Sequence, residues 1–375
     1  MIAFLVVALV AYGLIFFGWI VYPLVMHLIG RQRRAEAHAA AQPGVTVIVA
    51  TREDPAVMMV RVANLRDTDY PDHLLDIVIA VDTKAEHSLA SYQSAVGLGA
   101  RVVPGDTPGG KACNLNAGAR AATGELLILA DSHQRFDRRT IPELVRAFDD
   151  PRVGAASGAY TNRDPKASAS VLDIFWDYER ALRRAEAAVH SIVAVTGCNF
   201  GIRRELWRPL PSGLLCDDLL IPLDVAMSGR RVAFAEQAMA TDPRRFSRQQ
   251  EFTRKVRTLT GMLQVCAWRP AVLAPWRNPI WIQFVCHKLL RLATPYLLIL
   301  GTIATTVAAA SYLGWDVLAD ALVAILLTSV ILAILRPLAA RRLVQHAAWS
   351  LSLLASPIYA GANAVRGRWD VWQRH

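Results

Sequence analysis

The stretch Leu126-Leu127-Ile128-Leu129-Ala130-Asp131-Ser132-His133 joins an unbroken apolar run to a carboxylate and an imidazole. A short, continuous apolar run is typical of a strand that is buried on both faces of a parallel sheet. In open α/β sheets, ligands bind beyond the carboxyl ends of such strands, where Asp131 and His133 stand. A carboxylate and an imidazole two residues apart can bind one divalent cation, although a solvated strand end with a chance histidine has the same pattern.

Strand and helix patterns alternate from residue 43 to about residue 264, which predicts an α/β fold with parallel strands. The expected strands are residues 45–50, 77–81, 101–103 and 125–130, and the expected helices include residues 55–65 and 113–122. Thr51 and Glu53 follow the first strand, Asp82 follows the second and Asp131 the fourth. Because the carboxyl ends of parallel strands meet at one edge, we expect these residues to form a nucleotide-binding crevice.

Apolar segments at both ends of the chain predict a membrane protein. Of the 375 residues, 54% are hydrophobic, and residues 2–29 carry no charged side chain. At 1.5 Å per residue this first segment can span a bilayer, and because it lacks a basic leader we expect a retained anchor. Residues 292–310 and 317–335 predict two further spans. Arg31, Arg33 and Arg34 place the following domain in the cytoplasm by the positive-inside rule, which predicts a multi-pass protein of the cytoplasmic membrane.

These patterns divide the chain into four expected segments: an anchor at 1–30, a cytoplasmic domain at 43–264, interfacial helices at 265–291, and a C-terminal transmembrane region with a cytoplasmic tail at 292–375. Residues 346–364 form a fourth apolar segment, but a basic tail follows it. We therefore favour an interfacial or re-entrant helix there over a fourth span.

The charge and the cysteines exclude several classes of partner. The formal net charge is +10, but much of the excess flanks the apolar segments, where anionic headgroups are a sufficient partner, so nucleic acid is not expected. The five cysteines have no paired spacing, which argues against a disulfide framework and against a zinc site.

Five further segments accompany the strand ends in a fixed order: residues 111–118 (KACNLNAG), 196–204 (TGCNFGIRR), 216–218 (CDD), 229–234 (GRRVAF) and 287–291 (HKLLR). From residue 45 to the tail, this order resembles the membrane-bound, inverting family 2 glycosyltransferases. That family includes the hyaluronan, cellulose and poly-N-acetylglucosamine synthases and is related in pattern to ceramide glucosyltransferase. The resemblance implies a GT-A fold, a Rossmann-like mixed α/β sheet, here with N- and C-terminal transmembrane helices.

The resemblance also implies donor-binding roles. Asp82 would hold the uracil or ribose of a UDP-sugar, Lys111 would lie near the diphosphate, and the strand-end residues Thr51 and Glu53 would line the same crevice. Asp131 and His133 would bind Mn²⁺ or Mg²⁺. His133 departs from the usual Asp-x-Asp but is similar to the Asp-x-His of the polypeptide GalNAc-transferases, and imidazole favours manganese.

By the same resemblance, Asp218 would be the general base that deprotonates the acceptor hydroxyl. One base and no enzyme nucleophile means a single displacement, and therefore inversion at the anomeric carbon. The alternative for Asp217 and Asp218 is an N-cap pair for a helix at residues 219–228, and both roles can coexist.

Arg254, Lys255 and Arg257 stand where the family places the cations of a Gln/Arg-x-x-Arg-Trp motif, which would clamp the leaving diphosphate. A basic helix that faces solvent or headgroups is the alternative. Thr258 occupies the position of the Trp that stacks the acceptor sugar in processive members. We therefore expect a lipid or lipid-linked glycan acceptor, with polysaccharide synthesis by a homo-oligomeric assembly as the alternative.

Two unrelated functions fit fewer residues. Residues 105–111 match the G-x-x-x-x-G-K of a P-loop, but Ala112 stands where a magnesium-binding hydroxyl is needed, which makes a P-loop-like membrane ATPase a remote alternative. A non-catalytic scaffold or transporter is disfavoured because the apolar segments carry few polar groups.

Overall fold

The computed structural model describes residues 1–31, 42–161, 171–244, 246–335, 352 and 354–371. The chain divides into two compact units. One comprises residues 24–245 and 264–284, and we call it the sheet unit. The other comprises residues 1–23, 246–263 and 285–375, and we call it the helical unit. Each is described by itself.

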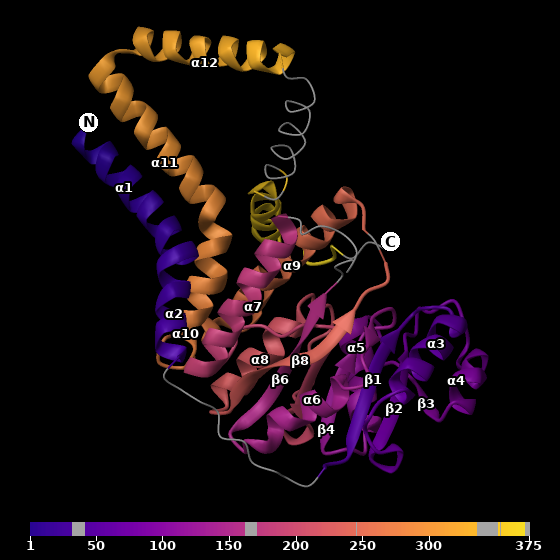
Figure 1. The fold of residues 1–375 in the computed structure, drawn as a ribbon. Helices are drawn as coiled ribbons and strands as arrows, with labels where there is room; N and C mark the ends of the chain where they lie inside the picture. The colour runs from indigo at the N-terminus through magenta and orange to yellow at the C-terminus, as the bar shows by residue number, and fades with distance from the viewer. Residues whose placement is uncertain (32–41, 162–170, 245, 336–351, 353, 372–375) are drawn as a thin grey trace. The chain divides into compact units, whose positions relative to one another are not determined.

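The sheet unit is built on one eight-stranded sheet with the order β3-β2-β1-β4-β7-β6-β8-β5 (Figure 1). The strands are β1 (Val45–Thr51), β2 (Leu75–Val81), β3 (Ala100–Pro104), β4 (Leu126–Ala130), β5 (Arg135–Phe136), β6 (Val153–Thr161), β7 (Asn199–Arg203) and β8 (Arg231–Thr241). The first four are mutually parallel, whereas β7 is antiparallel to both of its neighbours and β5 to β8. The mixed α/β sheet expected from the sequence is confirmed.

The central strands are buried along their whole length, as their apolar runs predict. Every residue of β4 is buried, and in β1 only Ala50 is partly exposed. The register aligns Val47 of β1 with Ile77 of β2 on one side and Ile128 of β4 on the other. Strands covered on both faces need no polar alternation, so a continuous apolar run specifies them.

Helices cover both faces of this sheet. They are α3 (Pro55–Arg66), α4 (Gln93–Gly97), α5 (Lys111–Ala121), α6 (Thr140–Arg146), α7 (Val171–Val189) and α8 (Asp217–Met227), with short helical turns at Asp72–Leu74, Leu89–Tyr92, Ala147–Asp149, Arg204–Leu206 and Pro270–Leu273. The α3 helix starts at the expected place because the Asp54 side chain accepts a hydrogen bond from the Ala56 N–H at 2.7 Å and Pro55 fills the first turn. Gly118 lets α5 lie close to β1, since a Cβ there would be 2.4 Å from Cγ2 of Ile48.

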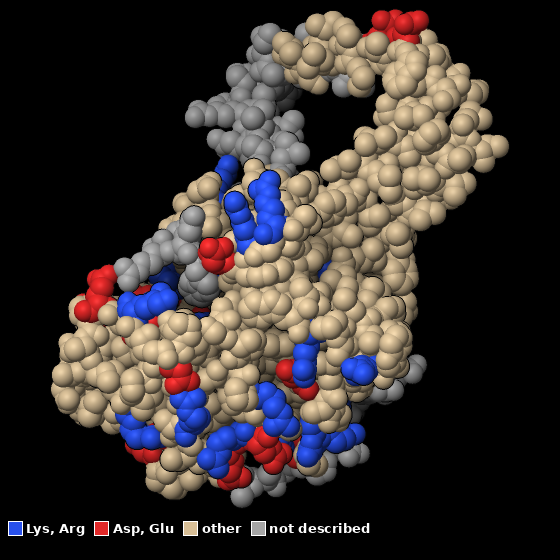
Figure 2. Space-filling model, turned by 180° about the vertical axis from the view of Figure 1, so that it is seen from behind, with Lys and Arg blue, Asp and Glu red and all other residues tan. Residues whose placement is uncertain are grey.

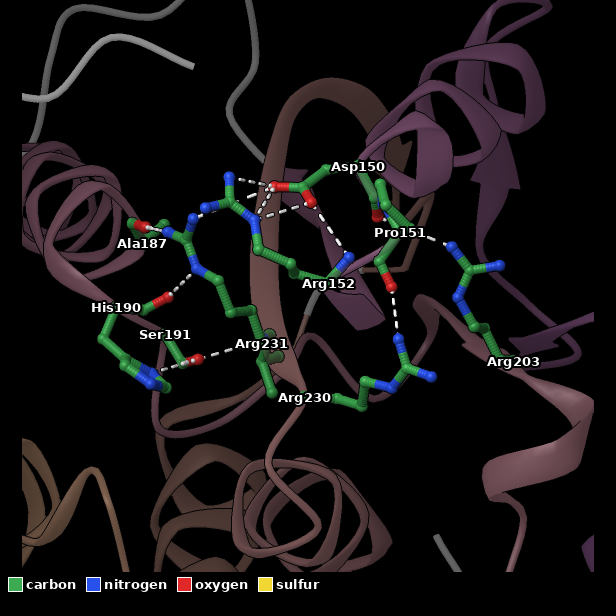
Figure 3. A network of polar contacts seen from close by, with 10 residues as sticks. Asp150, Pro151, Arg152, Ala187, His190, Ser191, Arg203, Arg230 and Arg231 are labelled. Atoms are coloured by element: carbon green, nitrogen blue, oxygen red, sulfur yellow. Dashed lines mark hydrogen bonds and ion pairs between the residues drawn. The ribbon is translucent and has the colours of Figure 1, made fainter. Parts of the chain in front are cut away.

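An arginine network closes the amino ends of β6 and β8 (Figure 3). The Asp150 carboxylate pairs with Arg152 at 2.8 Å and with Arg231 at 3.9 Å. Arg231 also donates to the carbonyls of Ala187 and His190 at 2.6 and 2.8 Å, which satisfies the last carbonyls of α7. The network therefore ties α7 to the edge of the sheet opposite the carboxyl ends of β1 and β4.

The remaining helices are α1 (Ile2–Phe16), a π-helical turn (Phe17–Val21), α2 (Tyr22–Gly30), α9 (Arg248–Trp268), α10 (Trp281–Gln283), a second π-helical turn (Phe284–Leu289), α11 (Leu290–Leu313) and α12 (Trp315–Leu335). Within the helical unit, α1 packs on α11. A Cβ on Gly301 would meet the Tyr12 ring at 2.9 Å, and Trp19 Nε1 donates to Thr294 Oγ1 at 3.0 Å. Small residues at such contacts let apolar helices approach closely.

Within the described residues, two continuous helical stretches are long and apolar enough to cross a membrane, Ile2–Gly30 and Trp281–Leu313. They contain the first two expected spans. The third expected span coincides with the helix α12, and residues 346–351 and 353 of the fourth segment lie outside the described residues. Large apolar side chains such as Ile2 and Leu9 are more than 70% exposed. In Figure 2 the long helices are almost entirely tan, whereas blue and red atoms are interspersed over the sheet unit.

Candidate active site

The site lies where the chain order of the sheet reverses. From β1 the chain continues to β2 and β3 on one side, while β4 pairs with β1 on the other side. Such a switch point opens a crevice at the carboxyl ends of the strands. The structure therefore brings the loops after β1, β2 and β4 together, and with them Thr51, Glu53, Asp82, Asp131 and His133.

Asp82 holds the loop that leads into α5. Its Oδ2 accepts hydrogen bonds from the Gly110 N–H at 2.6 Å and from Asn114 Nδ2 at 2.8 Å, and it pairs with Arg52 at 3.0 Å. Burial alone would raise the pKa of Asp82, but these donors and the Lys84 N–H outweigh it and lower the pKa. Donor binding by Asp82 stays a prediction, and the observed contacts give it a structural role in the loop.

The loop before α5 is packed against the carboxylate of Asp82. Gly109 has φ +88°, and a Cβ there would be 2.7 Å from the Asp82 carboxylate. The backbone amide of Gly110 is already bonded to that carboxylate at 2.6 Å. The amide that a P-loop would offer to a phosphate thus serves a protein carboxylate, which argues against the ATPase alternative.

Lys111 is the central cation of the site. Its Nζ lies 3.3 Å from Oδ1 of Asp131 and 3.2 Å from Oδ2 of Asp217. Burial alone would lower the pKa of Lys111, but the carboxylates of Asp131, Asp217 and Asp218 outweigh burial and raise it. Lys111 is therefore a fixed positive charge that links the end of β4 to the start of α8, where a diphosphate could contact it.

Asp131 and His133 are held from different directions. Asp131 is 39% exposed and contacts Lys111, while His133 is 26% exposed and its Nε2 lies 3.3 Å from Oε1 of Glu53. Within the described residues, no group of three or more acidic, histidine or cysteine side chains is arranged to hold a metal. A carboxylate and an imidazole are ligand types that suit Mn²⁺, so Asp131 and His133 are the residues that would hold such a cation.

Thr51 lies behind this edge of the sheet and is buried. Its Oγ1 accepts hydrogen bonds from the Glu53 N–H at 3.0 Å and from the Ser132 hydroxyl at 3.1 Å. Thr51 therefore joins the loop after β1 to the loop after β4. This structural role was not expected from the sequence, which predicted only that Thr51 lines the donor crevice.

The alternative reading of Asp217 and Asp218 as an N-cap pair is not what the structure shows. The helix α8 begins at Asp217, and Cys216 occupies the N-cap without a side-chain capping bond. Asp217 is instead buried against Lys111, while Asp218 is partly exposed and packs on Gly197, where a Cβ would come within 3.3 Å of its Oδ2. Both carboxylates still lie in the first turn, where the helix dipole favours negative charge.

Arg244 is a cation of the site that sequence reasoning missed. Its guanidinium binds Asp242 through two contacts of 3.0 and 2.9 Å, and Gln134, in the loop after β4, donates to the same carboxylate at 2.7 Å. Burial alone would lower the pKa of Arg244, but Asp242 outweighs it, and Asp131 and Glu53 raise the pKa further. The sequence does carry a signal for Arg244, because polar residues follow the end of β8. This strand runs parallel to β6.

The three expected clamp residues, Arg254, Lys255 and Arg257, lie on α9 in the helical unit. Arg254 stacks over the Phe246 ring at 4.2 Å and pairs with Glu251 at 3.3 Å. Their role at the diphosphate stays a prediction.

Comparisons with known proteins give a family match and a similar fold. Residues 46–209 match the model of "Glycosyl transferase family 2". The structure is similar to a mannosyltransferase from Pyrobaculum calidifontis, solved with GDP-Man and Mn²⁺, with a TM-score of 0.71, 22% identity, and coverage of 96% of this chain and 99% of that chain. A likeness at this identity shows the fold.

The S. aureus protein TarS gives a TM-score of 0.40 at 14% identity over 58% of this chain and 39% of that chain, which is too low to support an argument. No curated protein sequence matches the chain. The match of residues 46–209 to the family model and the mixed sheet together fit a family 2 glycosyltransferase with a GT-A fold.

Proposed function

We propose that the protein is an inverting, metal-dependent glycosyltransferase that moves a sugar from a UDP-sugar to a membrane-associated acceptor, a lipid or a lipid-linked glycan. The observation that supports this best is the group of Lys111, Asp131 and Asp217 at the switch point, directly beside Asp218. It provides fixed positive charge for a leaving diphosphate and a carboxylate for the acceptor.

The leaving diphosphate needs positive charge as the glycosidic bond breaks. Within the sheet unit, Lys111 and Arg244 supply it. The family resemblance implies the same role for Arg254, Lys255 and Arg257. A divalent cation, Mn²⁺ rather than Mg²⁺, would be held by Asp131 and His133 and would neutralise further diphosphate charge.

Asp218 is the proposed general base. It is partly exposed, whereas Asp217 is buried against Lys111 and is committed to that ion pair. Asp218 takes the proton of the acceptor hydroxyl while the diphosphate leaves from the opposite face of the sugar. A single displacement of this kind inverts the anomeric carbon and leaves no covalent enzyme intermediate.

UDP-sugars are the first donors to test, because the family resemblance implies them. GDP-mannose is the second, since the P. calidifontis mannosyltransferase was solved with GDP-Man and Mn²⁺.

The acceptor proposal rests on the membrane character of the chain. Arg31, Arg33 and Arg34 follow the first apolar helix, which supports a cytoplasmic catalytic domain in a multi-pass protein. Trp276 is 82% exposed and precedes the apolar helix Trp281–Leu313, as expected of a side chain at a bilayer interface. Thr258 offers no aromatic platform for a growing glycan.

The test is nucleotide release. Detergent-purified protein is incubated with Mn²⁺, each UDP-sugar or GDP-mannose in turn, and a membrane lipid extract. We expect one donor to yield nucleoside diphosphate in a reaction that depends on the extract and is lost in Asp218→Asn. Release from no donor, or release that is unchanged in Asp218→Asn, would contradict the proposal.

A further inference from the structure

One ring nitrogen of His133 lies beside a carboxylate. Nε2 is 3.3 Å from Oε1 of Glu53, an ion-pair distance. Within the described part of the chain, Nδ1 of His133 has no ion-pair partner of this kind. A neutral imidazole carries one donor and one acceptor nitrogen, and the partner of one nitrogen decides the role of the other.

The contact between Glu53 and His133 is built by buried groups around it. Thr51 Oγ1 joins the two loops by accepting from the Glu53 N–H at 3.0 Å and the Ser132 hydroxyl at 3.1 Å. The buried Tyr92 hydroxyl donates to the Glu53 carbonyl at 2.7 Å. Arg135 donates to the His133 carbonyl at 2.8 Å. Both backbones are therefore fixed, and the pairing is more than a chance meeting of exposed side chains.

We propose that Glu53 is a positioning residue for the metal: it accepts the Nε2–H of His133 and so leaves the Nδ1 lone pair for the divalent cation. This inference rests on the proposed metal site of Asp131 and His133 and replaces the direct donor contact expected for Glu53. Histidines that bind metals commonly donate their other N–H to a carboxylate, which fixes the tautomer and makes the ligand more basic.

The histidine in the Asp131-Ser132-His133 segment gives a physical reason for a carboxylate at Glu53. A carboxylate ligand has no tautomers and needs no acceptor behind it, whereas an imidazole with the proton on the wrong nitrogen cannot bind a cation. Glu53 and His133 would therefore act as one unit, and Glu53 would lose its importance if His133 were an aspartate.

The test measures Mn²⁺ affinity without turnover, by electron paramagnetic resonance of free Mn²⁺ in the presence of UDP. Glu53→Ala should weaken Mn²⁺ binding by about 10–100-fold, the usual effect of losing such a partner. Glu53→Gln removes the charge but keeps an acceptor oxygen, so it should bind Mn²⁺ more tightly than Glu53→Ala. Glu205→Gln, which removes an exposed carboxylate from the turn Arg204–Leu206, is the control and should bind like wild type.

The same substitution is then made in a His133→Asp background. There Glu53→Ala should change Mn²⁺ affinity by no more than about twofold, the usual limit of additivity for uncoupled positions. An equal loss in both backgrounds, or equal losses in Glu53→Gln and Glu53→Ala, would show that Glu53 contributes only charge and would overturn the inference.

The outcomes separate this inference from the proposed function. If wild type does not bind Mn²⁺, or if His133→Ala binds it as tightly as wild type, the proposed metal site itself fails. If His133→Ala weakens binding and neither Glu53 variant does, the metal site stands and the role of Glu53 is wrong. Circular dichroism of each variant confirms folding, and Glu53→Gln serves if Glu53→Ala does not fold.

Discussion

At the scale of single residues, the two neighbouring carboxylates of α8 have different surroundings. Asp217 is buried against Lys111 at 3.2 Å, whereas Asp218 is partly exposed beside Gly197. Identical side chains one position apart can therefore hold different roles, one in positioning a cation and one in proton transfer.

Asp218→Asn should lower kcat by about 10²–10⁴-fold, because the amide has the same size but cannot accept the proton. Donor affinity, measured by UDP titration, should stay near that of wild type. Asp217→Asn removes one of two carboxylates from Lys111 and should act mainly on donor KM. If Asp217→Asn abolishes transfer while Asp218→Asn spares it, the two roles are assigned the wrong way round.

Turnover should stop on chelation and return with Mn²⁺, because Asp131 and His133 are proposed to hold the cation. His133→Ala removes one of two protein ligands and should raise the Mn²⁺ concentration needed for half-maximal rate. His73→Ala, at an exposed histidine of the turn Asp72–Leu74, should behave like wild type. Full activity of His133→Ala in the presence of chelator would refute the metal role.

At the scale of elements, the residues of the proposed site and the arginine network lie at opposite edges of the sheet. The carboxyl ends of β1, β2 and β4 carry the proposed site, while the amino ends of β6 and β8 carry the arginine network of Figure 3. Changes in that network should therefore affect folding before they affect catalysis.

Asp150→Asn should lower the free energy of unfolding by about 1–2 kcal/mol, below the full value of charged hydrogen bonds because the side chain is partly exposed. Donor KM should not change. Hydrogen bonds from Arg152 lower the pKa of Asp150, so its contribution is present above the unfolded value near 3.9 and is lost as pH falls through the lower folded value.

The difference in unfolding free energy between wild type and Asp150→Asn should accordingly shrink below about pH 4. Asp72→Asn, at a side chain that is 84% exposed, is the matched control and should leave stability unchanged within about 0.5 kcal/mol. A destabilisation equal to that of Asp72→Asn would contradict the structural role of the network.

The apolar runs predicted the central strands, and the polar residues that end them predicted which loops meet. Both are local signals, because burial on two faces and a strand end are visible in a few consecutive residues. The contacts of Asp82 with Asn114 and of Lys111 with Asp217 join segments distant in the chain. Such pairs depend on packing, so the sequence could indicate the residues but not their partners.

Arg244 and the capping of α8 show the same limit. The polar residues after β8 mark the end of a strand. Only the order of strands in the sheet places this strand end beside β6 and beside the loop after β4. Asp217 satisfies the preference for a cap in sequence, yet its ion pair with Lys111 holds it inside the helix.

At the scale of the whole molecule, the region that matches the family 2 model, residues 46–209, is combined with helices long and apolar enough to cross a membrane. Thr258 bonds back to the Arg254 carbonyl at 3.0 Å and offers no aromatic surface to an acceptor sugar. We therefore expect one or a few sugars per acceptor. Mass spectrometry of the products should show short additions, and long soluble glycans made from a UDP-sugar alone would contradict this.

The most direct measurement follows the sugar into its product. Purified protein in lipid nanodiscs receives Mn²⁺, a lipid acceptor fraction and an isotope-labelled nucleotide sugar, and NMR gives the amount and anomeric configuration of sugar in the lipid fraction. We expect one nucleoside diphosphate to be released per sugar transferred, with an inverted anomeric configuration, and we expect both to be lost in Asp218→Asn. Retained configuration, or label released only as free sugar, would contradict it.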